Sequence, residues 1–356
     1  MKQEPVTRKG RGARANPAGR FEKQKSVAVD DGWSADEVEM SIATELFAEK
    51  AKTVITTNRS PDVPFDQSIN PYRGCEHGCV YCFARPSHAY VDLSPGLDFE
   101  TKIFFKEGAA ARLREELSAP GYRCKTIALG TNTDPYQPAE RELKVTRSLL
   151  EVMRACRHPV SIVTKGALIE RDIDILAELA ALRLASVMLS ITTLDNALKT
   201  TLEPRTAAPA ARLRCLRKLR EAGIPVGVLI APVIPAINDD EIEAIAERAA
   251  EAGAQSLGYV LLRLPFEVKE LFKDWLATHA PLKAERAMSI VRAMRGGLEY
   301  DSTWGERQTG TGPYADLIAR RFELVRKRFG FAERRMPESR TDLFEPPNLS
   351  GQMRLI

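Results

Sequence analysis

Short apolar runs alternate with amphipathic segments along the middle of the chain. The apolar runs predict buried strands at 125–130, 159–165, 186–193, 224–234 and 256–264. Between them, apolar residues recur at helical spacing, which predicts helices at 140–156, 169–182, 209–223 and 239–253. Further helical segments are expected from about 267 to 296.

This alternation predicts an α/β fold. Strands that are apolar along almost their whole length suit a parallel sheet covered by helices. Because the β–α repeat does not pause, it indicates a barrel or partial barrel rather than an open sheet. In such folds the reactive residues lie where strands end and loops begin. The unusual residues of this chain fall at such places, namely Cys75 to Cys82, Thr131 to Asp134, Lys165, Ser190 and the stretch from Pro232 onward.

The beginning of the chain lacks this pattern. Residues 1–25 hold eight Lys or Arg against two Glu and are rich in Gly, Pro and Ala. We therefore expect a disordered basic arm over residues 1–35. Such an arm is either a solvated tail or a segment that makes weak, salt-sensitive contact with nucleic acid. A short helix or an edge segment is expected within residues 33–57.

The main domain is expected over residues 36–296, followed by an extension over 297–332 and a flexible, Pro-containing tail over 333–356. The extension combines a Gly/Thr-rich loop with a basic amphipathic helix. We expect the loop GERQTGTGPY (305–314) to close the barrel or to touch substrate, and we assign it no chemistry.

The composition is typical of a soluble enzyme, with 44% hydrophobic and 28% charged residues. No apolar run approaches the ~20 residues that a membrane span needs, and the N-terminal stretch lacks the apolar core of a secretory signal. The sequence thus predicts a cytoplasmic protein with reduced thiols, which excludes disulfides. Metal binding, catalysis or chance remain to explain why three of six cysteines crowd together.

Those three cysteines, Cys75, Cys79 and Cys82, lie in the stretch NPYRGCEHGCVYCFAR. A structural zinc site needs four ligands, usually as two pairs, and the one local candidate, His77, is too close to Cys75 for easy geometry. Iron–sulfur clusters are commonly held by four cysteines. Three cysteines without a nearby fourth would leave one iron of a [4Fe–4S] cube open to a substrate or cofactor. Zinc and unliganded thiols remain as alternatives.

The segment CEHGCVYC resembles the cluster motif of the radical S-adenosylmethionine (SAM) superfamily, with Tyr81 at the aromatic position of the motif. Residues from about 69 to 265 fit that superfamily's partial (β/α)6 TIM barrel. The resemblance implies that Cys75, Cys79 and Cys82 ligate three irons and that SAM chelates the fourth. It also implies an electron donor such as flavodoxin or ferredoxin. Reduction would cleave SAM to methionine and a 5′-deoxyadenosyl radical, which abstracts hydrogen from a substrate.

The segment GTNTDPYQPAE (130–140) resembles the one that follows the second strand in the spore photoproduct lyase branch of this superfamily. The resemblance implies that Thr133 and Asp134 contact the methionyl group of SAM, whereas the plain alternative is a turn held by Asp134. It further implies that Lys165 pairs with the SAM carboxylate and that Ser190 supplies a small hydroxyl. A solvated lysine and a core serine are the alternatives.

Two later segments extend the implied SAM site. In LEPRT (202–206), Glu203 and Arg205 are expected to pair with each other, to touch SAM or to stabilise a loop. After the strand at 224–234, the backbone of Val233 and Ile234 and the side chain of Asn238 are expected to hold the adenine or ribose. Alternatively, Asn238 caps the next helix.

The remaining cysteines have no implied role in the cluster. Cys156 and Cys215 fall within predicted helices and are expected to be buried apolar residues. Cys124 precedes a strand and is expected at the far end of the barrel. The hydrogen-donating cysteine of the lyase corresponds to Thr131 here. A threonine hydroxyl is a poor hydrogen-atom donor, which argues against the photolesion reaction itself.

The final residues, Gln352 to Ile356, resemble the short peptide by which bacterial DNA-maintenance proteins dock on the sliding clamp, and the alternative is an inert tail. Together these features predict a radical SAM enzyme of lyase or oxidoreductase type that acts on nucleic acid, in DNA repair or in modification. A radical SAM enzyme acting on a small molecule or protein is the first alternative. A zinc-binding interaction protein is the second.

Overall fold

A seven-stranded sheet organises the molecule, for which the computed structural model describes residues 10–21, 42–333 and 336–348. The strand order is β10-β9-β8-β7-β6-β3-β2. All neighbours pair in parallel except β2, which is antiparallel to β3. The strands are β2 (Thr56–Thr57), β3 (Gln67–Ile69), β6 (Ile127–Leu129), β7 (Val160–Thr164), β8 (Ala185–Ser190), β9 (Val226–Val233) and β10 (Leu257–Leu261).

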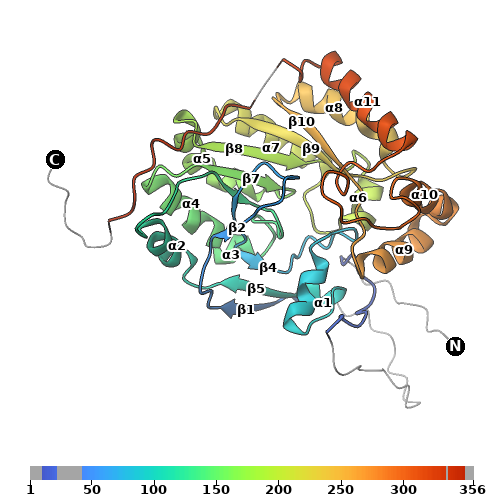
Figure 1. Ribbon diagram of the computed structural model, residues 1–356, viewed down its shortest axis with the longest axis horizontal. Helices are drawn as coiled ribbons and strands as arrows, with labels where there is room; N and C mark the ends of the chain where they lie inside the picture. Colours follow the sequence, from blue (N-terminus) through green and yellow to red (C-terminus); the bar gives the residue numbers. More distant parts are fainter. Residues whose placement is uncertain (1–9, 22–41, 334–335, 349–356) are drawn as a thin grey trace, which may run out of the picture.

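Helices cover one face of this sheet (Figure 1). The six parallel strands follow one another in chain order, and right-handed crossovers between such strands place every connecting helix on the same side. The sheet therefore curls into the expected partial (β/α)6 barrel. The covering helices are α2 (Ala109–Leu117), α4 (Val145–Ala155), α5 (Ile173–Ala181), α7 (Pro209–Glu221) and α8 (Ile242–Glu251), while the short helices α3 (Glu140–Leu143) and α6 (Asn196–Leu202) lie in the segments that follow β6 and β8.

Local sequence fixes where these helices begin and end. Helix α7 starts at Pro209, whose locked φ suits the first helical position and which has no N–H to lose there. Gly223 and Gly253 follow α7 and α8 with φ of +78° and +92°, a conformation that stops a helix and that glycine adopts without steric cost. Fully buried side chains such as Leu149 on α4 and Leu216 on α7 pack against buried strand residues such as Ile162 and Val187.

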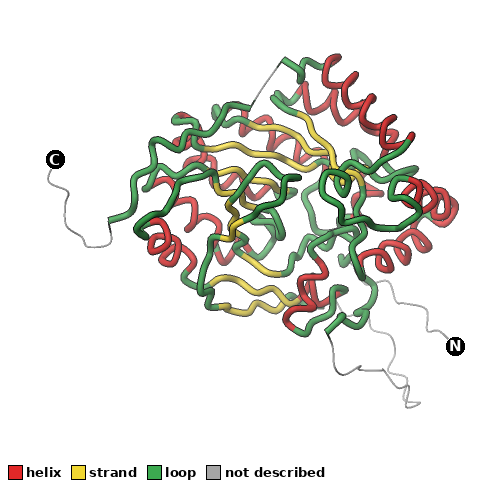
Figure 2. The backbone as a smooth tube through the Cα atoms, viewed as in Figure 1, coloured by secondary structure: helices red, strands yellow, loops and turns green. Residues whose placement is uncertain are grey.

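A second, smaller sheet combines β1, which precedes β2 in the chain, with β4 and β5, which lie between β3 and β6, and Figure 2 shows its strands apart from those of the main sheet. Its order is β1-β5-β4, with β1 parallel and β4 antiparallel to β5. The expected short helix or edge segment within 33–57 consists of strands β1 and β2, while residues 33–41 lie outside the described part. The elements of this region are β1 (Glu45–Glu49), β4 (Tyr72–Arg73), the 3₁₀ helix η1 (Arg85–Val91), α1 (Leu97–Thr101) and β5 (Lys102–Lys106).

The C-terminal extension shares the core of the barrel. It follows α9 (Val268–His279) and α10 (Pro281–Ala293) and contains α11 (Pro313–Arg328). The rings of Tyr259 on β10 and Phe322 on α11 stack with centroids 4.1 Å apart, and both belong to the same apolar cluster as the barrel strands. The apolar core therefore continues across residue 297, where the extension was expected to begin.

The loop 305–310 bridges the open side of the curled sheet. On one side, the carbonyl oxygen of Gln308 accepts a hydrogen bond of 2.8 Å from the backbone N–H of Leu261 at the end of β10. On the other side, the Arg307 side chain pairs with Asp62, in the loop that leads into β3. Of the two roles expected for this loop, closing the barrel is the one that these contacts support.

The ends of the chain differ from the predicted disorder where the structure describes them. Residues 10–21 pack along the loop that carries the clustered cysteines, and residues 336–348 run past α4 and α5 (Figure 1). In the latter segment the Phe344 ring lies 5.2 Å from His158, and the Glu345 N–H donates to the Cys156 carbonyl oxygen at 2.9 Å. Backbone hydrogen bonds to distant residues order these segments, although their composition resembles that of disordered chains. Residues 352–356 lie outside the described part.

None of the helices in the described residues is both long and apolar enough to cross a membrane.

Candidate active site

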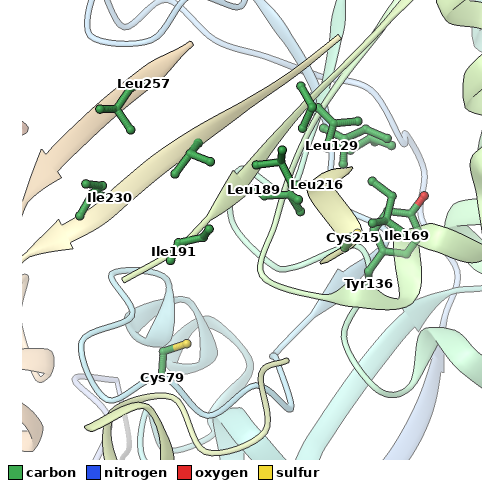
Figure 3. Close-up of a cluster of buried hydrophobic side chains, with 14 of the residues drawn as sticks. Cys79, Leu129, Tyr136, Ile169, Leu189, Ile191, Cys215, Leu216, Ile230 and Leu257 are labelled. Carbon is green, nitrogen blue, oxygen red and sulfur yellow. The ribbon is translucent and has the colours of Figure 1, made fainter. Parts of the chain in front are cut away.

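The three clustered cysteines lie on the loop between β4 and η1. Cys75 and Cys79 are buried, Cys82 is partly exposed, and all three are free thiols. The carbonyl oxygens of Cys75, Cys79 and Cys82 accept hydrogen bonds from the N–H groups of Gly78, Cys82 and Arg85. These successive tight turns bring the thiols within electrostatic reach of one another. In Figure 3, Cys79 lies at the edge of the buried apolar cluster, across from Ile191 beyond the end of β8.

The surroundings of the thiols suit thiolate ligands. Burial raises the pKa of all three cysteines, but each sulfur also has a neighbour that favours its charged form. These neighbours are the N–H of Asp134 for Cys75, the Lys165 ammonium group for Cys79 and the N–H groups of Ala84 and Arg85 for Cys82. Such donors orient and tune the thiolates of iron–sulfur clusters.

A single metal ion fits this loop less well. Among the described residues, no three His, Cys, Asp or Glu side chains converge in the way that would hold one ion. Thiolates are the ligands that iron–sulfur clusters take, so the three cysteines would supply the ligand type of the implied cluster.

Asp134 ties the cysteine loop to the end of β7. Its Oδ2 lies 3.2 Å from His77 Nδ1 and accepts a hydrogen bond of 2.7 Å from the backbone N–H of Lys165. Its Oδ1 accepts from the Thr164 hydroxyl at 2.6 Å and from the backbone N–H of Tyr136 at 2.9 Å. Burial alone would raise the pKa of Asp134, but His77 and these hydrogen bonds lower it to about 2. Because protein donors occupy both oxygens, the plain alternative of a turn-forming aspartate describes these contacts better than a direct contact with SAM.

Lys165 places a cation among the strand ends. Its ammonium group donates to the Ala231 carbonyl oxygen of β9 at 3.1 Å and lies 5.8 Å from the ring centroid of Tyr81. The same charge acts on Cys79 and Cys82. Lys165 thus stands next to the thiols, where a carboxylate bound beside them would find a partner.

A buried ion pair holds the Tyr81 hydroxyl in place. Glu203 and Arg212 are almost completely inaccessible and pair with each other, and Glu203 also accepts a hydrogen bond from the Tyr81 hydroxyl. Burial would raise the pKa of Glu203, yet Arg212 and the other nearby donors and charges lower it to about 2. The expected pairing of Glu203 with Arg205 is wrong. Helix α7 brings Arg212 to Glu203, and Arg205 instead pairs with Glu76 at 3.1 Å.

The model of the radical SAM superfamily matches residues 69–249, about half of the chain, and this span contains all three clustered cysteines. The protein belongs to the radical SAM superfamily. An uncharacterised protein of Mycobacterium tuberculosis is 39% identical over 232 residues, which cover 65% of this chain and 68% of the relative. An uncharacterised protein of Methanocaldococcus jannaschii is 28% identical over 202 residues, or 57% of this chain and 73% of the relative.

Solved structures of spore photoproduct lyase resemble this radical SAM protein in fold. The match covers 80% of this chain and 78% of the lyase, with 15% identity and a TM-score of 0.53. A structure of the lyase complexed with dinucleoside spore photoproduct matches with a TM-score of 0.51. At this identity the likeness concerns the fold. Membership of the superfamily makes the protein a radical SAM enzyme, with a [4Fe–4S] cluster and SAM as the family's cofactors.

Thr133 and Ser190, two of the other implied SAM contacts, are buried and engaged with protein groups of this radical SAM enzyme. The Thr133 hydroxyl donates to the Tyr72 carbonyl oxygen at 3.0 Å. The backbone carbonyl oxygen of Ser190 accepts from Arg212 at 2.8 Å, and the implied contact of the Ser190 hydroxyl with SAM stays a prediction. Asn70, which sequence reasoning overlooked, accepts from the N–H groups of Asn132 and Thr133 and so holds the loop after β6. Its position five residues before Cys75 is the feature of the sequence that could have marked Asn70 as part of the site.

Asn238 holds the turn after β9. Its side chain is fully buried, accepts from the Ile234 N–H at 2.6 Å and donates to the carbonyl oxygens of Thr192 and Pro232 at 2.6 and 3.0 Å. Asn238 occupies the N-cap position of the 3₁₀ helix Asp239–Glu241, but its side chain makes no capping hydrogen bond there. The Val233 carbonyl oxygen accepts from the Leu262 N–H at 3.0 Å, so that backbone group is likewise in use.

Proposed function

We propose that this radical SAM enzyme holds a [4Fe–4S] cluster through Cys75, Cys79 and Cys82 and abstracts hydrogen from a nucleic acid, in repair or modification. The observation that carries the first part is the set of three thiols facing donors and the Lys165 cation at the ends of the parallel strands. Bound there, the cluster would supply the electron that cleaves SAM to methionine and a 5′-deoxyadenosyl radical.

The residues of the chain divide the remaining work. Lys165 would hold the SAM carboxylate, because its ammonium group is anchored by one hydrogen bond and retains two further donors. Tyr81, fixed by Glu203, would present its ring beside the bound nucleotide. The loop 305–310 would keep solvent from the open side of the barrel, since its contacts bridge β10 and the loop before β3.

Two exposed aromatic rings, each beside an arginine, support nucleic acid as the substrate class. Phe83, directly after Cys82, is 45% exposed and lies 4.7 Å from the Arg263 guanidinium group. Phe266 is 54% exposed, with the Arg20 guanidinium group 3.7 Å from its ring centroid. Unpaired bases stack on such rings, and arginines contact the phosphates between them. The neighbouring lyase structure that contains a dinucleoside lesion supports the same class.

The cluster and its chemistry are tested by anaerobic reconstitution with iron and sulfide, followed by SAM and dithionite or a flavodoxin- or ferredoxin-type donor. We expect about four irons per chain and release of 5′-deoxyadenosine. Cys79→Ala should abolish both, whereas Cys156→Ala, which removes a buried thiol at the end of α4, should retain both. Wild-type protein that took up zinc but no iron would contradict the proposal.

Substrate class is tested separately by fluorescence anisotropy with a labelled single-stranded oligonucleotide over a salt series. Phe83→Ala should weaken binding by about 1–3 kcal/mol, the usual contribution of one stacked base. Leu324→Ala, which removes an exposed side chain from α11, is the matched control. Release of 5′-deoxyadenosine without salt-sensitive binding to the oligonucleotide would favour a small-molecule or protein substrate.

A further inference from the structure

We propose that residues 10–21, the N-terminal strap, position the cysteine loop for its cluster, with Glu100 and Gly12 as the positioning residues. This inference rests on the cluster of the proposed function and concerns a segment outside the superfamily match. Three separate contacts join the strap to the loop.

The first contact runs through Glu100, a fully buried carboxylate at the end of α1. Its Oε2 accepts the N–H of Gly12 at 2.9 Å, and its Oε1 accepts the N–H of Ala13 at 2.8 Å. The same carboxylate pairs with Arg85, which is also fully buried. The strap backbone thus completes the coordination of a buried charge.

Arg85 transmits this contact to the cysteines. Its Nε donates to the Cys79 carbonyl oxygen at 2.9 Å, and its Nη2 donates to the Gly78 carbonyl oxygen at 3.1 Å. A planar guanidinium group with fixed donors holds these two carbonyls in one orientation. The path from the strap to the backbone of Cys79 therefore consists of Glu100 and Arg85 alone.

The second contact is direct packing of Gly12 against Gly78. A Cβ atom added to Gly12 would lie 1.8 Å from the Gly78 carbonyl oxygen, a distance that no real side chain can adopt. The strap and the cysteine loop therefore touch backbone to backbone. Only glycine permits this approach at position 12.

The third contact reaches the residue after Cys75. The Arg11 guanidinium group donates to the Thr44 hydroxyl at 3.1 Å, and that hydroxyl donates to Glu76 Oε1 at 2.6 Å. Farther along, Ser94 donates to the Pro17 carbonyl oxygen at 2.6 Å, and Arg20 pairs with Glu267 at 2.9 Å. The strap is thus anchored on both sides of its contact with the loop.

The test compares Gly12→Val with Gly19→Ala after anaerobic reconstitution. Valine at position 12 must displace the strap, whereas a Cβ at Gly19 would lie 3.4 Å from its nearest neighbour, the Leu93 carbonyl oxygen, in ordinary contact. We measure the rate at which a ferrous chelator removes iron and the hydrogen exchange of the amides of residues 75–85. Gly12→Val should lose iron about tenfold faster or more and exchange faster, and Gly19→Ala should match the wild type.

Glu100→Gln provides a second route, because it keeps the side-chain size but removes the charge that faces Arg85. Should Gly12→Val not fold, faster iron loss in Glu100→Gln supports the proposal and an unchanged rate overturns it. Iron loss at the wild-type rate in both variants also overturns it. Neither readout needs SAM or substrate. Wild-type protein without iron contradicts the proposed function, whereas retained iron with unchanged variants contradicts only the role of the strap.

Discussion

Two buried carboxylate–arginine pairs flank the cysteine loop and act on different parts of it. The outer pair, Glu100–Arg85, binds backbone groups, namely the strap N–H groups and the carbonyls of Gly78 and Cys79. The inner pair, Glu203–Arg212, binds the Tyr81 side chain and the end of β8. The outer pair thus fixes the shape of the loop, and the inner pair fixes the side chain of Tyr81, which we propose lies beside bound SAM.

Breaking one pair at a time is expected to separate these roles. Arg212→Met leaves Glu203 buried without its partner, and the free energy of unfolding of the metal-free protein should fall by about 3–5 kcal/mol. Arg85→Met should cost a similar amount because Glu100 is equally buried. Urea denaturation measures the free energy of unfolding of both variants.

The two variants should differ in function. Iron release should accelerate more in Arg85→Met, and SAM affinity, measured by calorimetry, should fall more in Arg212→Met.

The control is the double variant Glu203→Leu with Arg212→Met, which removes both charges of the inner pair. It should be more stable than Arg212→Met alone, because no unpaired buried charge is left. A double variant no more stable than the single one would mean that lost packing, and not the unpaired charge, explains the first result.

The stability of the inner pair should depend on pH. The pKa of Glu203 falls from an ordinary 4.5 to about 2 in the folded protein, so its contribution is complete above about pH 5 and is lost as the pH falls from 4.5 through 2. The pKa of Asp134 is likewise lowered, from an ordinary 3.8 to about 2. Glu203→Gln should therefore differ from the wild type in urea midpoint at pH 7 and by about half as much or less at pH 3, where this contribution is partly lost. An equal difference at both values would contradict the assigned cause.

The smallest effect is expected far from both pairs. Phe344 packs on Tyr122 and His158 with ring centroids 5.5 and 5.2 Å away, and it is partly exposed. Phe344→Ala should lower the free energy of unfolding by about 1–2 kcal/mol and leave iron release unchanged. Faster iron release in this variant would show that general loosening, and not either pair, governs retention of the cluster.

The barrel was largely predictable because its strands are short apolar runs. The run at 186–193, for example, corresponds to β8 at Ala185–Ser190, and the run at 256–264 to β10. Strand β1 was predictable only as an uncertain segment, since ELFAE is mostly exposed and gains its structure by pairing with β5, more than fifty residues later. Periodicity carries no information about such pairing.

The site was predictable where one motif carries it and not where distant segments meet. The spacing of the cysteines identified the cluster loop, but the partners of Asp134 come from the loop itself and from β7. Pairing with Arg205 was one of the alternatives for Glu203, whereas its actual partner Arg212 lies on α7 and the sequence does not show that this helix packs there. The strap has the composition of a disordered arm, and its bonds to Glu100 span 87 and 88 residues.

The loop 305–310 also covers part of an edge of the seven-stranded sheet, where another chain could otherwise pair. Strand β10 is an edge strand of the seven-stranded sheet, and such an edge offers free backbone groups to another chain. Gln308 occupies the N–H of Leu261 at one end of this edge. At the opposite edge, β2 spans only two residues and runs antiparallel, which makes it a poor template for strand addition. The Gln308 contact at β10 and the shortness of β2 thus both disfavour self-association through pairing of sheet edges.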